Sequence, residues 1–111
     1  MSSFDMEKFA NGWNREFLFG VELMNKLYKY LIVRYPTKII EHDTESDFCH
    51  HVFISIDDKG NKISIFHPTD KKVLYETFII NDKDHTTEHD KNFAFDTRED
   101  LEAYIFKVLN P

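Results

Sequence analysis

The chain has 111 residues and a formal net charge of −6, and 41% of its residues are hydrophobic, 15% aromatic and 31% charged. This length predicts a single domain over residues 1–111, and the acidic balance disfavours nucleic-acid binding, which needs a basic surface. No segment approaches the roughly 20 apolar residues of a membrane span. Residues 1–7 contain no base, unlike a secretory leader. We therefore expect a cytoplasmic protein that binds neither nucleic acid nor membrane.

The first predicted element is helical. A short opening turn is expected to end or kink at Asn11-Gly12, and a long helix should start near Asn14. Pro36 should end it, because a proline disfavours helical geometry in the residue before it. Apolar residues spaced three or four apart form one stripe on this helix: Phe17, Val21, Met24, Tyr28, Leu31 and Tyr35.

Strand patterns follow the helix. Residues 51–57 alternate between apolar and polar, residues 58–61 predict a hairpin turn, and Ile63 and Ile65 continue the inward face of the returning strand. Residues 81–92 contain no apolar side chain, so they predict a solvated loop or a hairpin tip. Further strands are expected at residues 37–41, 73–80 and 93–95.

The end of the chain predicts a second helix. Thr97 and Asp100 approximate a capping box, and an apolar stripe follows: Leu101, Tyr104, Ile105, Val108 and Leu109. The predicted fold is therefore α+β: a long N-terminal helix, an antiparallel meander of four to five strands, and a C-terminal helix packed on the sheet. Both helices are expected on one sheet face.

The negative charge is concentrated in residues 41–58, which contain six acids and no Lys or Arg. In an extended segment, alternating acids project from one face about 6.6 Å apart, and such a ladder would attract a basic partner. Neighbouring aromatic residues could anchor the contact. The alternative is that these acids only solvate loops and sheet edges. The predicted partner-binding residues are Glu41, Asp43, Glu45, Asp47, Asp57, Asp58, Phe48 and Phe53.

Histidine and cysteine clusters raise a second possibility, metal or hydrolytic chemistry. Cys49 precedes two histidines, and residues 85–89 have the letters H-x-x-E-H of an inverted zinc-protease motif. That motif needs a helix with both histidines on one side, and no apolar face is present here to hold such a helix. A zinc site from Cys49, one adjacent histidine, His85 and His89 is chemically conceivable but lacks a C-x2-C pair. We predict no catalytic residue, metal or cofactor.

These observations favour a non-enzymatic protein-binding module. The expected type is an acidic inhibitor or immunity protein that neutralises a basic protein, such as a nuclease toxin or a nucleic-acid-binding enzyme. A small metal-binding or hydrolytic domain and an acidic chaperone or adaptor are the alternatives. Tyr30, Ile32 and Val33 lie off the main helical stripe, so they are expected either against the last helix or at a homodimer face.

Overall fold

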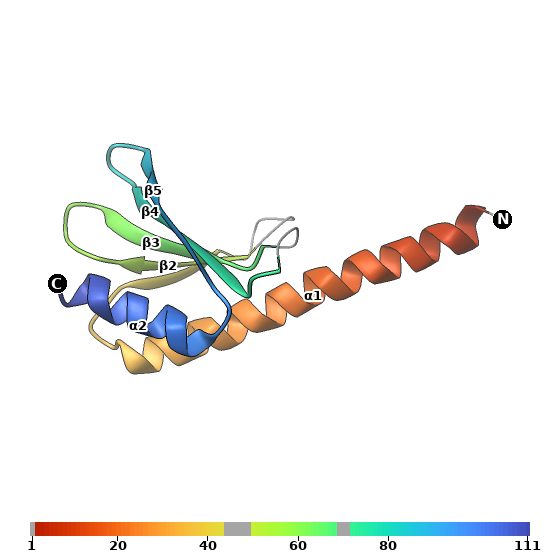
Figure 1. The fold of residues 1–111 in the computed structure, drawn as a ribbon, viewed down its shortest axis with the longest axis horizontal. Coiled ribbons are helices and arrows are strands. Elements are labelled where there is room, and N and C mark those ends of the chain that lie inside the picture. Colours follow the sequence, from red (N-terminus) through yellow and green to blue (C-terminus); the bar gives the residue numbers. More distant parts are fainter. Residues whose placement is uncertain (1, 44–49, 69–71) are drawn as a thin grey trace.

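The computed structural model describes residues 2–43, 50–68 and 72–111, with side chains described in residues 18–43, 50–68, 72–88 and 92–111. Its elements confirm the predicted α+β order of a long helix, a meander sheet and a C-terminal helix (Figure 1). They are α1 (Ser2–Arg34), β1 (Ile40–Asp43), β2 (His51–Ser55), β3 (Asn61–Phe66), β4 (Tyr75–Asn81), β5 (Thr86–Phe95) and α2 (Arg98–Leu109).

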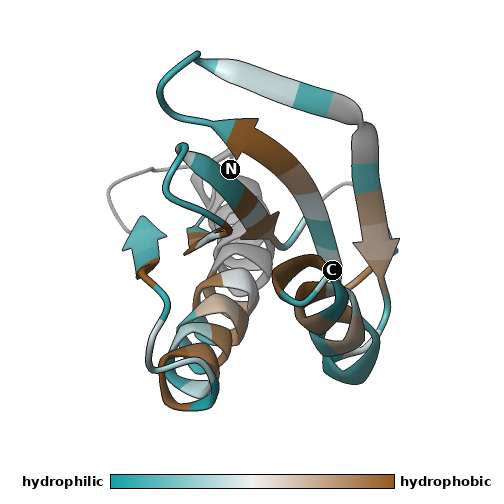
Figure 2. Ribbon diagram, turned by 90° about the vertical axis from the view of Figure 1, so that its left-hand side faces the viewer, coloured by the Kyte–Doolittle hydropathy of each residue, from teal (hydrophilic) through white to brown (hydrophobic). Residues whose placement is uncertain are grey.

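The five strands form one antiparallel sheet in the order β1-β2-β3-β4-β5, so each strand pairs with its neighbour in sequence. Both helices lie on the same face of this sheet, as predicted (Figure 2). Alternate residues of β2, β3 and β4 point toward them, because successive side chains of a strand face opposite sides. The buried apolar core contains Met24, Leu27, Leu31, Val52, Ile54, Ile63, Ile65, Tyr75, Ile79, Leu101 and Ile105.

Helix α1 differs from its prediction at the start. The helix runs without a break through Asn11-Gly12, so the expected end or kink is wrong, while its end at Arg34 agrees with the stop predicted from Pro36. A single glycine costs a helix only about 1 kcal/mol relative to alanine, which the rest of a long helix offsets. The N-terminal part of α1 projects beyond the sheet (Figure 1). Within the described residues, no helix is both long and apolar enough to cross a membrane.

The prediction of a solvated loop or a hairpin tip over residues 81–92 holds only for the hairpin turn, because most of this segment belongs to strand β5. Only residues 82–85 form the turn, where His85 has a φ of 54°, and the chain then pairs with β4 from Thr86 onward. Most of β5 is hydrophilic and it is an edge strand (Figure 2). Backbone pairing with β4 therefore stabilises the first part of the strand, residues 86–92, which has no apolar side chain. The register shifts between Thr77 and Ile79.

A polar contact joins the two helices. The Tyr30 hydroxyl donates to Glu102 Oε2 at 2.7 Å, and Arg34 Nε donates to Glu102 Oε1 at 3.1 Å. The hydrogen bond from Tyr30 is the main cause that lowers the pKa of Glu102. Tyr30 thus contacts the last helix, which is the first of the two positions predicted for it. Val33 is 78% exposed and belongs to no such contact.

Candidate functional site

The sheet face opposite the helices carries a dense set of polar and aromatic side chains. In β1 to β4 these residues alternate with the buried core positions, and they pair across neighbouring strands. No described helix covers this side (Figures 1 and 2). We call it the open sheet face, and its residues are Glu41, Asp43, His51, Phe53, Lys62, Ser64, Phe66, Glu76 and Phe78.

An aromatic row crosses the open sheet face. The His51 and Phe66 rings stack with centroids 5.2 Å apart, and Phe66 stacks on Phe78 at 5.6 Å with the planes only 6° from parallel. Phe53 lies 5.7 Å from His51 on the same face. All four rings are half-buried. They form an aromatic strip from β2 to β4, the kind of area that anchors protein interfaces.

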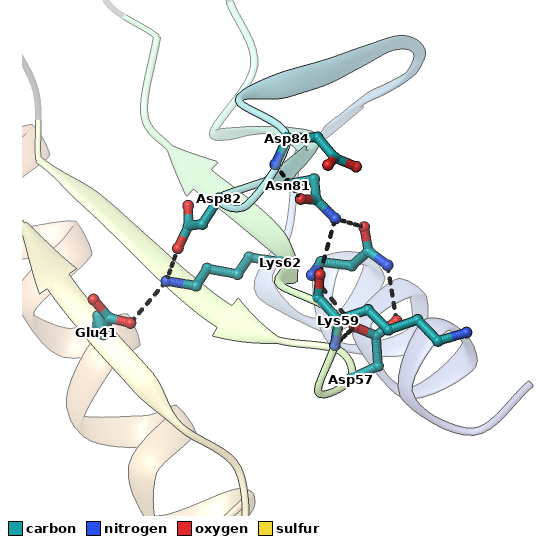
Figure 3. Close-up of polar contacts among 8 residues, drawn as sticks. Glu41, Asp57, Lys59, Lys62, Asn81, Asp82 and Asp84 are labelled. Atoms are coloured by element: carbon teal, nitrogen blue, oxygen red, sulfur yellow. Dashed lines mark hydrogen bonds and ion pairs between the residues drawn. The ribbon is translucent and has the colours of Figure 1, made fainter.

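Carboxylates border this aromatic row on β1. Register places Glu41 opposite Phe53 and Asp43 opposite His51. Lys62 Nζ donates to Glu41 Oε1 at 2.9 Å and also pairs with Asp82, so two carboxylates share one ammonium group (Figure 3). These hydrogen bonds raise the pKa of Lys62, so it is charged at neutral pH. Residues 41–58 contain no Lys or Arg, but the sheet places Lys62 of β3 beside Glu41.

Two further residues on this face are buried although no helix covers them. Glu76 and Ser64 are each 4% exposed. Glu76 Oε1 accepts a hydrogen bond from Asn92 Nδ2 at 3.0 Å, and Ser64 Oγ lies 3.4 Å from His51 Nδ1. A buried carboxylate is stable only with such partners. Glu76 therefore adds a fixed, buried carboxyl group to the β4 side of the face.

The turn between β2 and β3 holds another part of the predicted site. The Asp57 carboxylate accepts hydrogen bonds from Lys59 N at 2.9 Å and from Asn61 Nδ2 at 2.8 Å (Figure 3). The hydrogen bond from Asn61 is the main cause that lowers the pKa of Asp57. Asp58 is exposed, and its backbone carbonyl accepts from Lys83 Nζ at 2.8 Å. The carboxylate of Asp57 thus stabilises the turn through these hydrogen bonds, whereas the side chain of Asp58 faces solvent.

The structure brings together three of the predicted partner-binding residues, Glu41, Asp43 and Phe53, on the open sheet face. Asp57 and Asp58 lie at the β2–β3 turn, while Glu45, Asp47 and Phe48 lie outside the described residues. Sequence reasoning missed the other six residues of the face: His51, Lys62, Ser64, Phe66, Glu76 and Phe78. The signal that could have found them is that they occupy every second position of β2, β3 and β4, between the inward apolar residues. This pattern can be seen in each strand separately.

The two predicted histidine clusters do not converge, although the His42 and His50 rings lie 5.7 Å apart. His51 is level with Phe66, Glu76 and Ala94 in the sheet, whereas His85 lies in the turn that follows Asn81, at the opposite end of β4. Residues 85–89 form a turn and a strand, so the H-x-x-E-H letters lack the helix that the protease motif needs. Within the described residues, no three His, Cys, Asp or Glu side chains are grouped to hold a metal ion. Cys49 lies outside these residues.

Comparison with known proteins yields no match to a protein family, to a curated protein or to a solved structure.

Two histidines predict how stability depends on pH. Burial lowers the pKa of His51, against a smaller opposing effect of Asp43, and burial also lowers the pKa of His42 beside Tyr28. The unfolded chain then binds more protons than the folded chain below about pH 6.5. We expect the melting temperature to fall between about pH 7 and pH 5, before the carboxylates titrate.

Substitution tests the origin of this pH dependence. His51→Asn should reduce the loss of melting temperature on acidification, because asparagine does not titrate. The matched control His85→Asn should leave the loss unchanged, because His85 is exposed and asparagine tolerates its positive φ. An equal loss in the wild type and in His51→Asn would assign the effect to other groups.

Proposed function

We propose that this protein is a non-enzymatic binding module that inhibits or neutralises a basic protein, and that the open sheet face is its docking surface. The observation that carries the proposal is the position of Glu41 and Asp43 directly beside Phe53 and His51 on an uncovered sheet face. This combination provides apolar contact area and negative charge within one surface. This chemistry fits best an immunity-type protein whose partner is a nuclease toxin.

Charge supports a cationic partner. The face has carboxylates at Glu41, Asp43 and Glu76, while Lys62 is the one Lys or Arg among its defined residues. Lys62 is itself held by Glu41 and Asp82, which reduces its repulsion of a cation. Opposite charge accelerates the encounter of two proteins and selects against acidic partners.

The aromatic row supports the same class of partner. Lysine and arginine side chains contribute hydrocarbon stems that pack on rings and charged ends that interact favourably with ring faces. Phe53 and His51 lie next to carboxylates that can pair with those ends. A nuclease or nucleic-acid-binding enzyme exposes such basic side chains where it contacts phosphates. Occupying them would block its substrate.

A charge variant tests the proposal. Glu41→Gln with Asp43→Asn should slow association with a basic partner, captured from the native host and then purified, by about tenfold at low salt. The matched control, Glu22→Gln with Glu99→Gln, removes the same charge from exposed helical positions and should associate like the wild type. Surface plasmon resonance at several salt concentrations measures both rates. Equal rates and equal salt dependence for both variants would exclude the open sheet face as the docking surface.

A further inference from the structure

A second surface feature lies on the helix side of the sheet. An open cleft of about 390 Å³ separates the β4–β5 hairpin from the later turns of α2. The register of β4 and β5 pairs Ile79 with Glu88, so both lie on the helix-facing side of the hairpin. The residues that matter for its chemistry are Ile79, Phe93, Tyr104, Val108, Glu88 and Asn61. Its volume is in the lower part of the range typical of ligand pockets, about 300–1,000 Å³.

The walls of the cleft are largely apolar and aromatic. The Phe93 and Tyr104 ring centroids are 5.2 Å apart, with the planes tilted by 49°. Phe93 is 46% exposed although it lies opposite the fully buried Thr77. Two rings at this angle present a concave surface that suits a methylene chain, and they attract a cation that approaches their faces.

The polar groups of the cleft favour a positive charge. Glu88 is exposed, so its carboxylate lies where the cleft meets solvent. Asn61 is held rigidly, because its Nδ2 donates to Asp57 Oδ2 at 2.8 Å and its Oδ1 accepts from Asn81 Nδ2 at 2.8 Å. The ionised Asp57 carboxylate therefore lies directly behind one wall. A carboxylate that lines an apolar cleft, with a second one behind Asn61, disfavours an anionic ligand and favours a cationic one.

We propose that this cleft binds a primary alkylammonium group. The hydrocarbon chain lies against Phe93, Tyr104 and Val108, and the ammonium group pairs with Glu88. The shared chemistry fits either a free alkylamine or the side chain of a lysine on a protein. This site is on the opposite side of the sheet from the open sheet face, so it stands independently of the proposed function.

Titration of isotope-labelled protein with hexylammonium, followed by NMR, tests the site. We expect saturable shift changes at Ile79, Phe93, Tyr104 and Val108, and hexanoate should bind at least about tenfold more weakly. Glu88→Gln should weaken hexylammonium binding about threefold, the size typical of an exposed ion pair, and leave hexan-1-ol binding unchanged. The control Asp84→Asn removes a charge from the same hairpin and should change neither affinity.

The remaining outcomes assign the ligand or overturn the site. Val108→Phe fills the cleft and should abolish binding of both hexylammonium and hexan-1-ol. Lysine blocked at its α-amino and α-carboxyl groups distinguishes the two sources of the ligand. If it binds as tightly as hexylammonium, the ligand is a lysine side chain on a protein; if it binds more weakly, the ligand is a free alkylamine. Equal affinity for hexanoate and hexylammonium, or shift changes outside the cleft, would overturn the proposal.

Discussion

Ile105→Asp should leave the protein unfolded at room temperature. Ile105 is fully buried in the core beneath the sheet, together with Leu101 from the same helix. An aspartate there would place a charge among apolar side chains without a partner, and such changes cost more than about 4 kcal/mol. That loss is comparable to the total stability of a typical small domain, about 5–15 kcal/mol. Circular dichroism during thermal and urea unfolding measures it.

Two neighbouring variants separate the burial of this position from helix propensity. Phe106→Asp introduces the same residue one position later, where the side chain is 52% exposed, and should cost at most about 1 kcal/mol. Ile105→Val removes one methyl group and should cost about 1 kcal/mol. If Ile105→Asp melted at the wild-type temperature, α2 would not be part of the core.

Phe53→Ala should weaken binding to the basic partner by about 30-fold or more, equivalent to about 2 kcal/mol. Phe53 lies between Glu41 and Ser64 on the open sheet face, and its ring is close to His51. Removing it takes away apolar contact area from the centre of the proposed interface and leaves every charge in place. The effect should therefore appear as faster dissociation and not as slower association.

The control for this variant is Phe106→Ala, which removes an equally large and more exposed ring from α2, away from the open sheet face. It should bind the partner as the wild type does. Melting temperatures of both variants show whether either is misfolded. Equal affinity of Phe53→Ala and the wild type would remove the aromatic row from the binding surface.

Local patterns carried most of the fold prediction. The spacing of Leu101 and Ile105 predicted a buried helical stripe, and alternation predicted the inward positions Val52 and Ile54; all four are buried. The first part of β5, residues 86–92, escaped prediction because an edge strand can be held by backbone pairing to β4, and these residues have no apolar side chain. The start of α1 escaped it for a different reason, since one glycine only weakens a helix.

The candidate site was less predictable because it depends on strand order. Glu41 and Phe53 could be selected from composition and alternation, but their neighbours Phe66 and Phe78 come from two other strands. The counter-charge of Glu41 is Lys62, 21 positions away in sequence. Such neighbours become visible only after the pairing of β1, β2 and β3 is known. The cleft beside Glu88 was hidden for the same reason, since residues 81–92 were expected to form a loop or a hairpin tip and not a strand.

Carboxyl footprinting by mass spectrometry, with and without the purified basic partner, tests most directly whether the open sheet face is the docking surface. The reagent labels exposed carboxylates, and the side chain of Glu41 is 55% exposed in the free protein. Binding through this face should protect Glu41 and Asp43 from labelling and leave the exposed helical residues Glu22 and Glu99 unchanged. Protection of Glu22 or Glu99 with unchanged labelling of Glu41 and Asp43 would contradict it and place the partner on the helices.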